Sequence, residues 1–342
     1  MTIWYDATTS MRATSRNGIA NVEWSIGEGL RAGGDVRFFA SRARHGLVEI
    51  DPDTDLAAAF YASDPVDAPL TVTVAAPTWR DRVRGLLRDT LGPRSTPVIR
   101  TISAVYQAPK QVRRRLSRAG RAGAAPTPAV RLRDVVGPGD VVVSMGAEWE
   151  GKLASELADL RARTGCRVVT MVYDLIPLTH THLAFHKEPD LFERYYTSLL
   201  GCSDLITCIS EQSRQDLLRF AADRGLTVPR TEVLYLGEHL PDAPPGVARD
   251  GDFFLWVGTV ERRKNLDLVF DALRILESEG ARLPTVVVAG ATGWGVSDLL
   301  NELALQSTAA SRAIVMLGPV DDATLDRLYR RARALLFPSH YE

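Results

Sequence analysis

Residues 253–266 read FFLWVGTVERRKNL, and this stretch decides the fold of the C-terminal part of the chain. Its apolar start predicts a buried strand that ends at Gly258, and a helical apolar pattern begins at Leu266. Three consecutive cations, Arg262 to Lys264, therefore fall beside a helix N-terminus, where unpaired N–H groups and the helix dipole favour an anion. We take this turn as a candidate site for the diphosphate of a sugar nucleotide, although a solvated basic loop has the same local pattern.

The same unit, a strand followed by a turn and a helix, recurs along the chain. Apolar runs predict strands at 3–6, 36–40, 140–144, 167–172, 205–209, 231–236, 253–257, 285–289, 314–317 and 334–337. Helical periodicity is found at 22–30, 150–163, 190–200, 296–306 and 324–331, and further helices open at 210 and 266. This alternation predicts parallel strands covered by helices, which is an α/β fold.

The chain has 342 residues, which is more than one ordinary hydrophobic core holds, so two domains are expected. The best linker is the stretch PDAPPG at 241–246, which separates a domain at 1–240 from a domain at 251–342. The chain stops at Glu342, just after a predicted strand, where a doubly wound domain normally continues into a helix. We therefore expect the second domain to be incomplete.

The composition is ordinary for a soluble globular protein, with 45% hydrophobic residues, 24% charged residues and a net charge of −1. The near-zero charge gives no argument for a nucleic-acid partner. Cys166, Cys202 and Cys208 are widely spaced in apolar segments, which predicts reduced core thiols. With no signal peptide pattern and no long apolar run, we expect a cytoplasmic protein.

Residues 78–133 differ from the rest of the chain, because fourteen Lys or Arg stand there against two Asp. Apolar residues are interleaved at helical spacing, and a basic amphipathic helix can lie on an anionic membrane surface. We therefore expect a basic helical insertion and peripheral association with the membrane. A solvated, Arg-rich helical hairpin is the alternative, and nucleic acid is less favoured because no series of stacking aromatic residues is present.

Several segments together resemble the GT4 family of glycosyltransferases. In the second domain they are VGTVERRKN (257–265), GPVD (318–321) and LFPSHYE (336–342). In the first domain they are NGIA (17–20), YDLIP (173–177) and DLITCISEQS (204–213). The resemblance implies the GT-B fold, in which two Rossmann-like domains face each other across a cleft, with the acceptor domain first and the nucleotide-sugar donor domain second. It is greatest to bacterial members that build O-antigen and other surface polysaccharides, often as mannosyl- or rhamnosyltransferases.

The resemblance also implies which residues bind the donor. Arg263 and Lys264 match the family's basic pair that binds the diphosphate. Gly18 matches the loop glycine that lets the backbone approach the sugar and the phosphate. The nucleotide-binding turn near the base corresponds to Gly318, Pro319 and Val320.

Two carboxylates are the catalytic candidates. Glu342 matches the first glutamate of the family's Glu-x7-Glu motif, which lies beside the transferred sugar, and Asp174 lies in the acceptor-side loop. Two positions depart from the family pattern, since Thr259 and Tyr173 stand where many members have Arg and His. The second departure leaves the identity of the acceptor base open.

The implied reaction is retaining transfer of a hexosyl unit, such as mannosyl, from a nucleotide-diphosphate sugar to a glycan or lipid-linked acceptor in polysaccharide biosynthesis. No metal or other cofactor is expected, because the cations and a helix N-terminus would stabilise the leaving diphosphate. Two other functions stay open: a non-catalytic sugar-nucleotide or glycan-binding partner, and a sugar-nucleotide epimerase of the same fold.

A histidine cluster raises a separate possibility. His180, His182 and His186 follow the spacing H-x-H-x3-H, which some zinc sites use. No cysteine joins them, so a polar loop over the cleft is the favoured interpretation.

Overall fold

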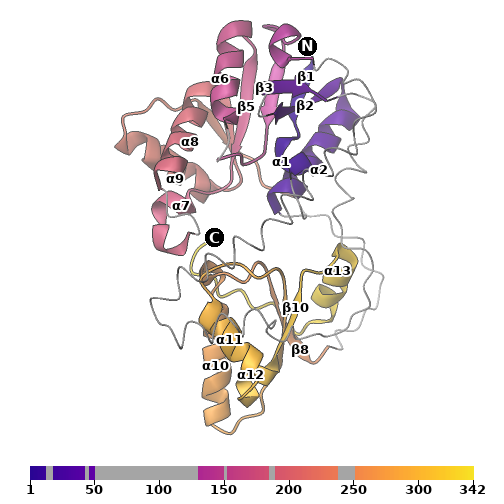
Figure 1. The fold of residues 1–342 in the computed structure, drawn as a ribbon, viewed down its shortest axis with the longest axis vertical. Coiled ribbons are helices and arrows are strands. Elements are labelled where there is room, and N and C mark those ends of the chain that lie inside the picture. The colour runs from indigo at the N-terminus through magenta and orange to yellow at the C-terminus, as the bar shows by residue number, and fades with distance from the viewer. Residues whose placement is uncertain (13–17, 43–45, 51–129, 150–151, 185–188, 238–250) are drawn as a thin grey trace, which may run out of the picture.

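The computed structural model describes residues 1–12, 18–42, 46–50, 130–149, 152–184, 189–237 and 251–342. These residues form two α/β units, each with its own sheet, and the C-terminal end of the chain lies between the two (Figure 1). The α/β class and the parallel sheets predicted from the sequence are therefore confirmed. The basic segment lies outside the described residues except for 130–133, as do the predicted linker at 241–246 and His186.

The first sheet has the strand order β3-β2-β1-β4-β5-β6-β7. Its strands are β1 (Ile3–Asp6), β2 (Val36–Arg42), β3 (Gly46–Glu49), β4 (Val141–Ser144), β5 (Arg167–Val172), β6 (Leu205–Cys208) and β7 (Arg230–Val233). Neighbouring strands are parallel except β2 and β3, which are antiparallel. Its helices are α1 (Thr8–Arg12), α2 (Gly18–Gly33), α6 (Leu153–Thr164), α7 (Ile176–Thr179), α8 (Pro189–Cys202) and α9 (Glu211–Asp223).

Both faces of this sheet are covered, because successive strand residues point to opposite sides. On β4, Val142 belongs to a core shared with α6, α8 and α9, whereas Val143 packs with residues of α2. On β5, Val168 and Met171 divide between the same two cores. Such strands carry nearly continuous apolar runs, which is why the sequence predicted them well.

The second sheet has the order β10-β9-β8, and all its strands are parallel. Its elements are β8 (Phe253–Val257), α10 (Leu266–Ser278), β9 (Thr285–Ala289), α11 (Ser297–Leu305), α12 (Ala309–Ala313), β10 (Ile314–Gly318) and α13 (Asp322–Arg331). The predicted strand at 334–337 is only a single bridge, between Leu255 and Leu335. The backbone N–H of Leu336 still donates to the carbonyl of Leu255 at 2.7 Å, so this segment runs beside β8 and leads to Glu342.

Four elements differ from the sequence prediction. No helix was predicted in the polar stretch after β1, but Thr8–Arg12 is the helix α1. The loop after β5 contains the short helix α7, and β3 and α12 were not predicted. The carboxylate of Glu23, on α2, explains α1, because it accepts backbone N–H groups of Thr9 and Ser10 that a polar sequence alone would leave unpaired. None of the helices in the described ranges is long and apolar enough to cross a membrane.

Candidate functional site

Three glycines end the three parallel strands of the second sheet. Gly258, Gly290 and Gly318 follow or close β8, β9 and β10, with φ angles of 142°, 150° and 74°. A Cβ atom on Gly290 would lie 1.8 Å from the carbonyl oxygen of Gly258, so no side chain fits there. The carboxyl edge of this sheet is therefore a floor of bare backbone, which a ligand can approach closely.

The cationic turn lies at this edge, between β8 and α10. Residues Arg262–Lys264 form a 3-10 turn, and α10 begins at Leu266 as the sequence predicts. The side-chain amide of Asn265 donates to the carbonyl of Pro338 at 3.1 Å. The backbone N–H of His340 donates to the carbonyl of Arg263 at 2.9 Å. These two bonds hold the C-terminal segment of the chain against the turn.

The result is a convergence of Arg263 and Lys264 on the carboxylate of Glu342. Arg263 Nη1 lies 2.7 Å from Glu342 Oε2, and Lys264 Nζ lies 2.6 Å from Glu342 Oε1. The two cationic side chains are only 18% and 17% exposed, so they are held with little freedom. The structure thus brings together three of the residues that the sequence singled out, although Glu342 lies far from the other two along the chain.

Glu261 is a member of this cluster that the sequence reasoning did not single out. Its Oε1 atom accepts a bond from Arg263 Nε at 3.1 Å, and its Oε2 atom accepts one from the indole Nε1 of Trp294 at 3.1 Å. Arg263 is therefore fixed between two carboxylates. The signal available was weak, because a single acid beside three cations fits an exposed loop equally well.

The contacts of the cluster favour the charged forms of Glu342 and Arg263. Burial raises the pKa of Glu342, but hydrogen bonds from Lys264, Ser339 and Arg263 outweigh it and hold that pKa below its ordinary value. Burial lowers the pKa of Arg263, and the bonds to Glu342 and the charge of Glu261 reverse this, so the pKa is raised. In this structure the carboxylates of Glu261 and Glu342 thus balance the two cations, and an anion that replaces Glu342 would meet Arg263 and Lys264.

Asp174 approaches this cluster from the first unit, where it follows β5. Its Oδ1 atom accepts the backbone N–H of Ile176 at 2.9 Å. Burial raises the pKa of Asp174, the bond from Ile176 and the positive charge of Arg263 oppose this, and the negative charge of Glu342 adds to it. The charges of Arg263 and Glu342, in the second unit, therefore act on Asp174 in the first.

The remaining predicted residues occupy two other places. Gly18 is the first residue of α2, and the residues before it, 13–17, lie outside the described part of the chain. The carbonyl of Gly318 accepts the backbone N–H of Gly290 at 2.8 Å, so the turn formed by Gly318, Pro319 and Val320 joins the glycine floor. Asp321 then caps α13.

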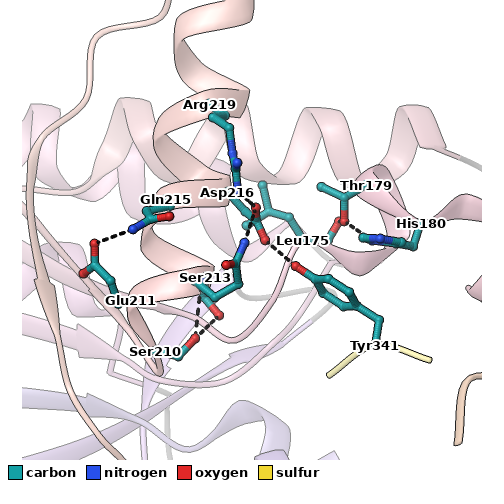
Figure 2. Close-up of polar contacts among 11 residues, drawn as sticks. Leu175, Thr179, His180, Ser210, Glu211, Ser213, Gln215, Asp216, Arg219 and Tyr341 are labelled. Atoms are coloured by element: carbon teal, nitrogen blue, oxygen red, sulfur yellow. Dashed lines mark hydrogen bonds and ion pairs between the residues drawn. The ribbon is translucent and has the colours of Figure 1, made fainter. Parts of the chain in front are cut away.

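A contact between the two units joins His180, from the predicted histidine cluster, with Tyr341 and Asp216, which the sequence analysis did not select. The hydroxyl of Tyr341 donates to Asp216 Oδ2 on α9 at 3.0 Å, and the Tyr341 ring stacks on His180, with ring centroids 4.0 Å apart (Figure 2). Asp216 was hidden in the sequence because it stands on a helix among other polar residues. Its burial, 7% exposed, is visible only in the fold.

A buried pair of carboxyl groups, Asp6 and Glu23, lies where the strand order of the first sheet reverses, between β1 and β4. Asp6 accepts bonds from the hydroxyls of Ser144, at 2.8 Å, and Thr8. Glu23 is fully buried nearby, and burial together with the charge of Asp6 raises its pKa to about 8, against the hydrogen bonds from Ser10 and Thr9. This position is the usual place of a ligand site in an α/β sheet, but here the carboxylates are used to hold α1.

The described histidines do not form a metal centre. The rings of His180 and His182 have centroids 6.2 Å apart, and His180 Nδ1 lies 2.9 Å from the hydroxyl of Thr179. Within the part of the chain that the structure describes, no group of three or more His, Cys, Asp or Glu side chains could hold a metal ion.

Comparison with known proteins agrees with this architecture. Residues 242–342 match the family model of the glycosyl transferases group 1. The crystal structure of Anabaena Alr3699/HepE in complex with UDP and glucose superposes with a TM-score of 0.53 over 99% of this chain and 74% of that one, at 14% identity. The two-unit architecture is thus the GT-B fold.

The chain is also similar in sequence to curated mannosyltransferases. The O-antigen chain mannosyltransferase B of Escherichia coli is 28% identical over 188 residues, which cover 52% of this chain and 48% of the relative. The serotype-specific mannosyltransferase WbdA of Escherichia coli is 24% identical over 219 residues, which cover 59% of this chain and 26% of the relative. The chain therefore spans about half the length of the first relative and about a quarter of the second.

Proposed function

We propose that this protein is a retaining glycosyltransferase that moves a hexosyl unit, mannosyl or a similar sugar, from a nucleotide-diphosphate sugar to a glycan or lipid-linked acceptor. The observation that carries the proposal is the convergence of Arg263 and Lys264 on one point, at 2.7 and 2.6 Å from the carboxylate of Glu342. An anion already occupies that point, and it lies beside a backbone floor of three strand-end glycines. The likeness to O-antigen mannosyltransferases supports the choice of sugar class.

The diphosphate takes the place that Glu342 now holds on the two cations. Arg263 is suited to a phosphate because its planar guanidinium can donate two parallel bonds, and Lys264 adds a compact charge. When the anomeric bond breaks, negative charge grows on the leaving diphosphate, and fixed donors at that position stabilise it more than the ground state. No metal ion is needed in this scheme, since the two cations supply the positive charge.

Displacement from the cations frees the carboxylate of Glu342 beside the transferred sugar. An oxocarbenium-like sugar carries positive charge, which a neighbouring carboxylate stabilises. Asp174 reaches the same region from the other unit, and its raised pKa suits a group that exchanges a proton with the acceptor hydroxyl. The acceptor attacks the face that the diphosphate leaves, so the anomeric configuration is retained.

The decisive experiment is a transfer assay on the full-length protein with UDP- and GDP-hexoses and a panel of α-hexosides, with the product configuration read by NMR. We expect transfer with retention, and its loss in Lys264→Ala and Arg263→Ala. Arg282→Ala is the matched control, because Arg282 lies in the same unit, is 90% exposed and pairs with Asp252. Epimerised nucleotide sugar without acceptor would identify an epimerase, and binding without turnover would identify a sugar-binding partner.

A further inference from the structure

An open pocket of about 460 Å³ lies between α7 and α9, and the C-terminal segment closes one side of it. Its volume is within the range of about 300–1,000 Å³ that is usual for small-molecule sites. Figure 2 shows how Tyr341, from the second unit, points toward Asp216 and His180 of the first. The pocket is therefore complete only where both units meet.

The polar side of the pocket is a network centred on Asp216. Its Oδ1 atom accepts bonds from Gln212 Nε2 at 3.0 Å and from Arg219 Nη2 at 2.5 Å, and its Oδ2 atom accepts the hydroxyl of Tyr341 (Figure 2). The Arg219 side chain is 63% exposed, so most of its N–H groups are open to a ligand. The planar guanidinium of Arg219 and amide of Gln212 are held in place and can donate several hydrogen bonds, which suits the neighbouring hydroxyl groups of a sugar.

The opposite side is apolar and aromatic. Leu175 and Phe220 are buried, and the rings of His180 and Tyr341 stack with an interplanar angle of 31°. Sites of this kind, an apolar floor and an aromatic wall with a few fixed polar groups, suit an amphipathic ring. A pyranose is such a ring, since its C–H groups form apolar patches and its hydroxyls lie around the edge.

The charge of the pocket favours a neutral ligand. Arg219 and Arg224 are offset by Asp216 and Asp223 among the lining residues. Arg224 is further bound through two nitrogens to Glu193, at 2.8 and 3.2 Å. The pocket therefore has no excess of positive charge with which to select a phosphate, in contrast to the turn that carries Arg263 and Lys264.

The position of the pocket links it to the proposed chemistry. Leu175 directly follows Asp174, and Tyr341 directly precedes Glu342, so two lining residues adjoin the two catalytic candidates. The carbonyl of Tyr341 also accepts a bond from Arg263 Nη1 at 2.9 Å. The pocket thus shares two backbone segments with the site where the hexosyl unit is proposed to be transferred.

We infer that this pocket binds a neutral hexose residue of the acceptor glycan, with Arg219, Gln212 and His180 contacting its hydroxyls. The inference rests on the proposed function for the role of the ligand as acceptor. It adds the binding residues and the charge class of the acceptor. It also makes acceptor binding dependent on the contact between the two units.

The test uses methyl α-D-mannopyranoside, with methyl β-D-galactopyranoside alongside, titrated into the full-length protein and followed by saturation-transfer NMR. We expect saturable binding of at least one hexoside, and a dissociation constant at least fivefold higher in Arg219→Ala and His180→Ala. The control Arg282→Ala should bind as the wild type does. Arg219→Lys, which keeps the charge but loses the planar fork, should bind as weakly as Arg219→Ala.

Two outcomes overturn the inference: no saturable binding of either hexoside, or equal binding by wild type and Arg219→Ala. Thermal melting of each variant checks that the fold is intact. UDP and GDP affinity, measured in the same samples, separates the two proposals. If nucleotide binding depends on Lys264 but no hexoside binds, only the inference about the pocket is refuted. If a hexoside binds but no nucleotide does, the proposed transferase function is refuted.

Discussion

Lys264→Ala offers the most direct test of the donor site. Lys264 Nζ lies 2.6 Å from Glu342 Oε1, and its side chain is largely buried. A hydrogen bond to a charged group contributes about 1.5–3 kcal/mol, and a diphosphate on Lys264 would gain this amount. Binding must also break the present ion pair with Glu342, which contributes up to about 1 kcal/mol in a partly exposed setting.

Subtracting about 1 kcal/mol from this gain predicts that Lys264→Ala weakens binding of UDP or GDP by about 0.5–2 kcal/mol, which is a factor of roughly 2 to 30 in the dissociation constant. Isothermal titration calorimetry measures this directly on the full-length protein. Lys264→Arg keeps the charge and should lose less affinity than the alanine variant. UMP and GMP should show a much smaller penalty, because they lack the second phosphate that Lys264 is proposed to contact.

Two results would refute the reasoning. The first is a Lys264→Ala protein that melts normally and binds UDP and GDP within twofold of the wild type. The second is an equal loss of monophosphate and diphosphate binding, which would place Lys264 near the nucleoside or in a purely structural role. Arg282→Ala controls for the loss of a cation from the same unit, since it changes net charge equally without touching the cluster.

The remaining predictions concern stability, the contact between the units and the basic segment. Gly290→Ala should lower the free energy of unfolding, measured by chemical denaturation, by at least about 3 kcal/mol, because φ of 150° and the 1.8 Å approach to Gly258 exclude a Cβ. The control Gly201→Ala, exposed on α8 with open space around it, should be neutral or slightly stabilising. Glu23→Gln should make the melting temperature fall less steeply as pH rises. The pKa of Glu23 is raised to about 8 in the folded protein, so its stabilising contribution is full below the unfolded pKa of about 4.5 and is lost as pH rises toward 8. Equal pH dependence of the melting temperature in wild type and Glu23→Gln would contradict this. Tyr341→Phe removes the bond to Asp216, worth about 1 kcal/mol, and small-angle scattering should show a more open average arrangement, with no change counting against the contact. Residues 78–133 should bind anionic vesicles in a salt-sensitive manner, and equal sedimentation with neutral vesicles would exclude a membrane role.

Strands buried on both faces were predictable because most of their residues are apolar. The runs at 3–6, 167–172, 253–257 and 285–289 match β1, β5, β8 and β9 residue for residue. The segment 334–337 has the same apolar character but forms only one bridge to β8. Apolar composition alone therefore predicts neither burial nor a complete strand, since Leu335 and Phe337 are 44% and 58% exposed.

The local sequence pattern did not predict the helix α1. Thr8, Thr9 and Ser10 favour turns, because their hydroxyls compete for backbone groups. What allows a helix is the carboxylate of Glu23, which arrives from α2 and accepts two of the first N–H groups. No window of the sequence around α1 contains that partner.

Some residues of the candidate site could likewise be predicted from the local sequence, and others could not. The turn with Arg263 and Lys264 was predictable, since its strand, glycine and helix are contiguous. The approach of Glu342 came from a family resemblance, not from spacing, because residues almost eighty apart carry no local signal of contact. Glu261, Asp216 and Tyr341 needed the fold, because an acid beside cations, an acid on a polar helix and a lone tyrosine are all ordinary surface patterns.

The dipeptide Tyr341-Glu342 links the two proposed sites. Tyr341 contacts Asp216 and His180 in the first unit, while Glu342 holds Arg263 and Lys264 in the second. The hydrogen bond from Tyr341 to Asp216 is worth about 1 kcal/mol, so this bond alone favours contact between the units about fivefold. A diphosphate that displaces Glu342 shifts this dipeptide, and a hexose that packs on Tyr341 restrains it. Donor and acceptor should therefore influence each other's affinity reciprocally, through a segment that both sites share.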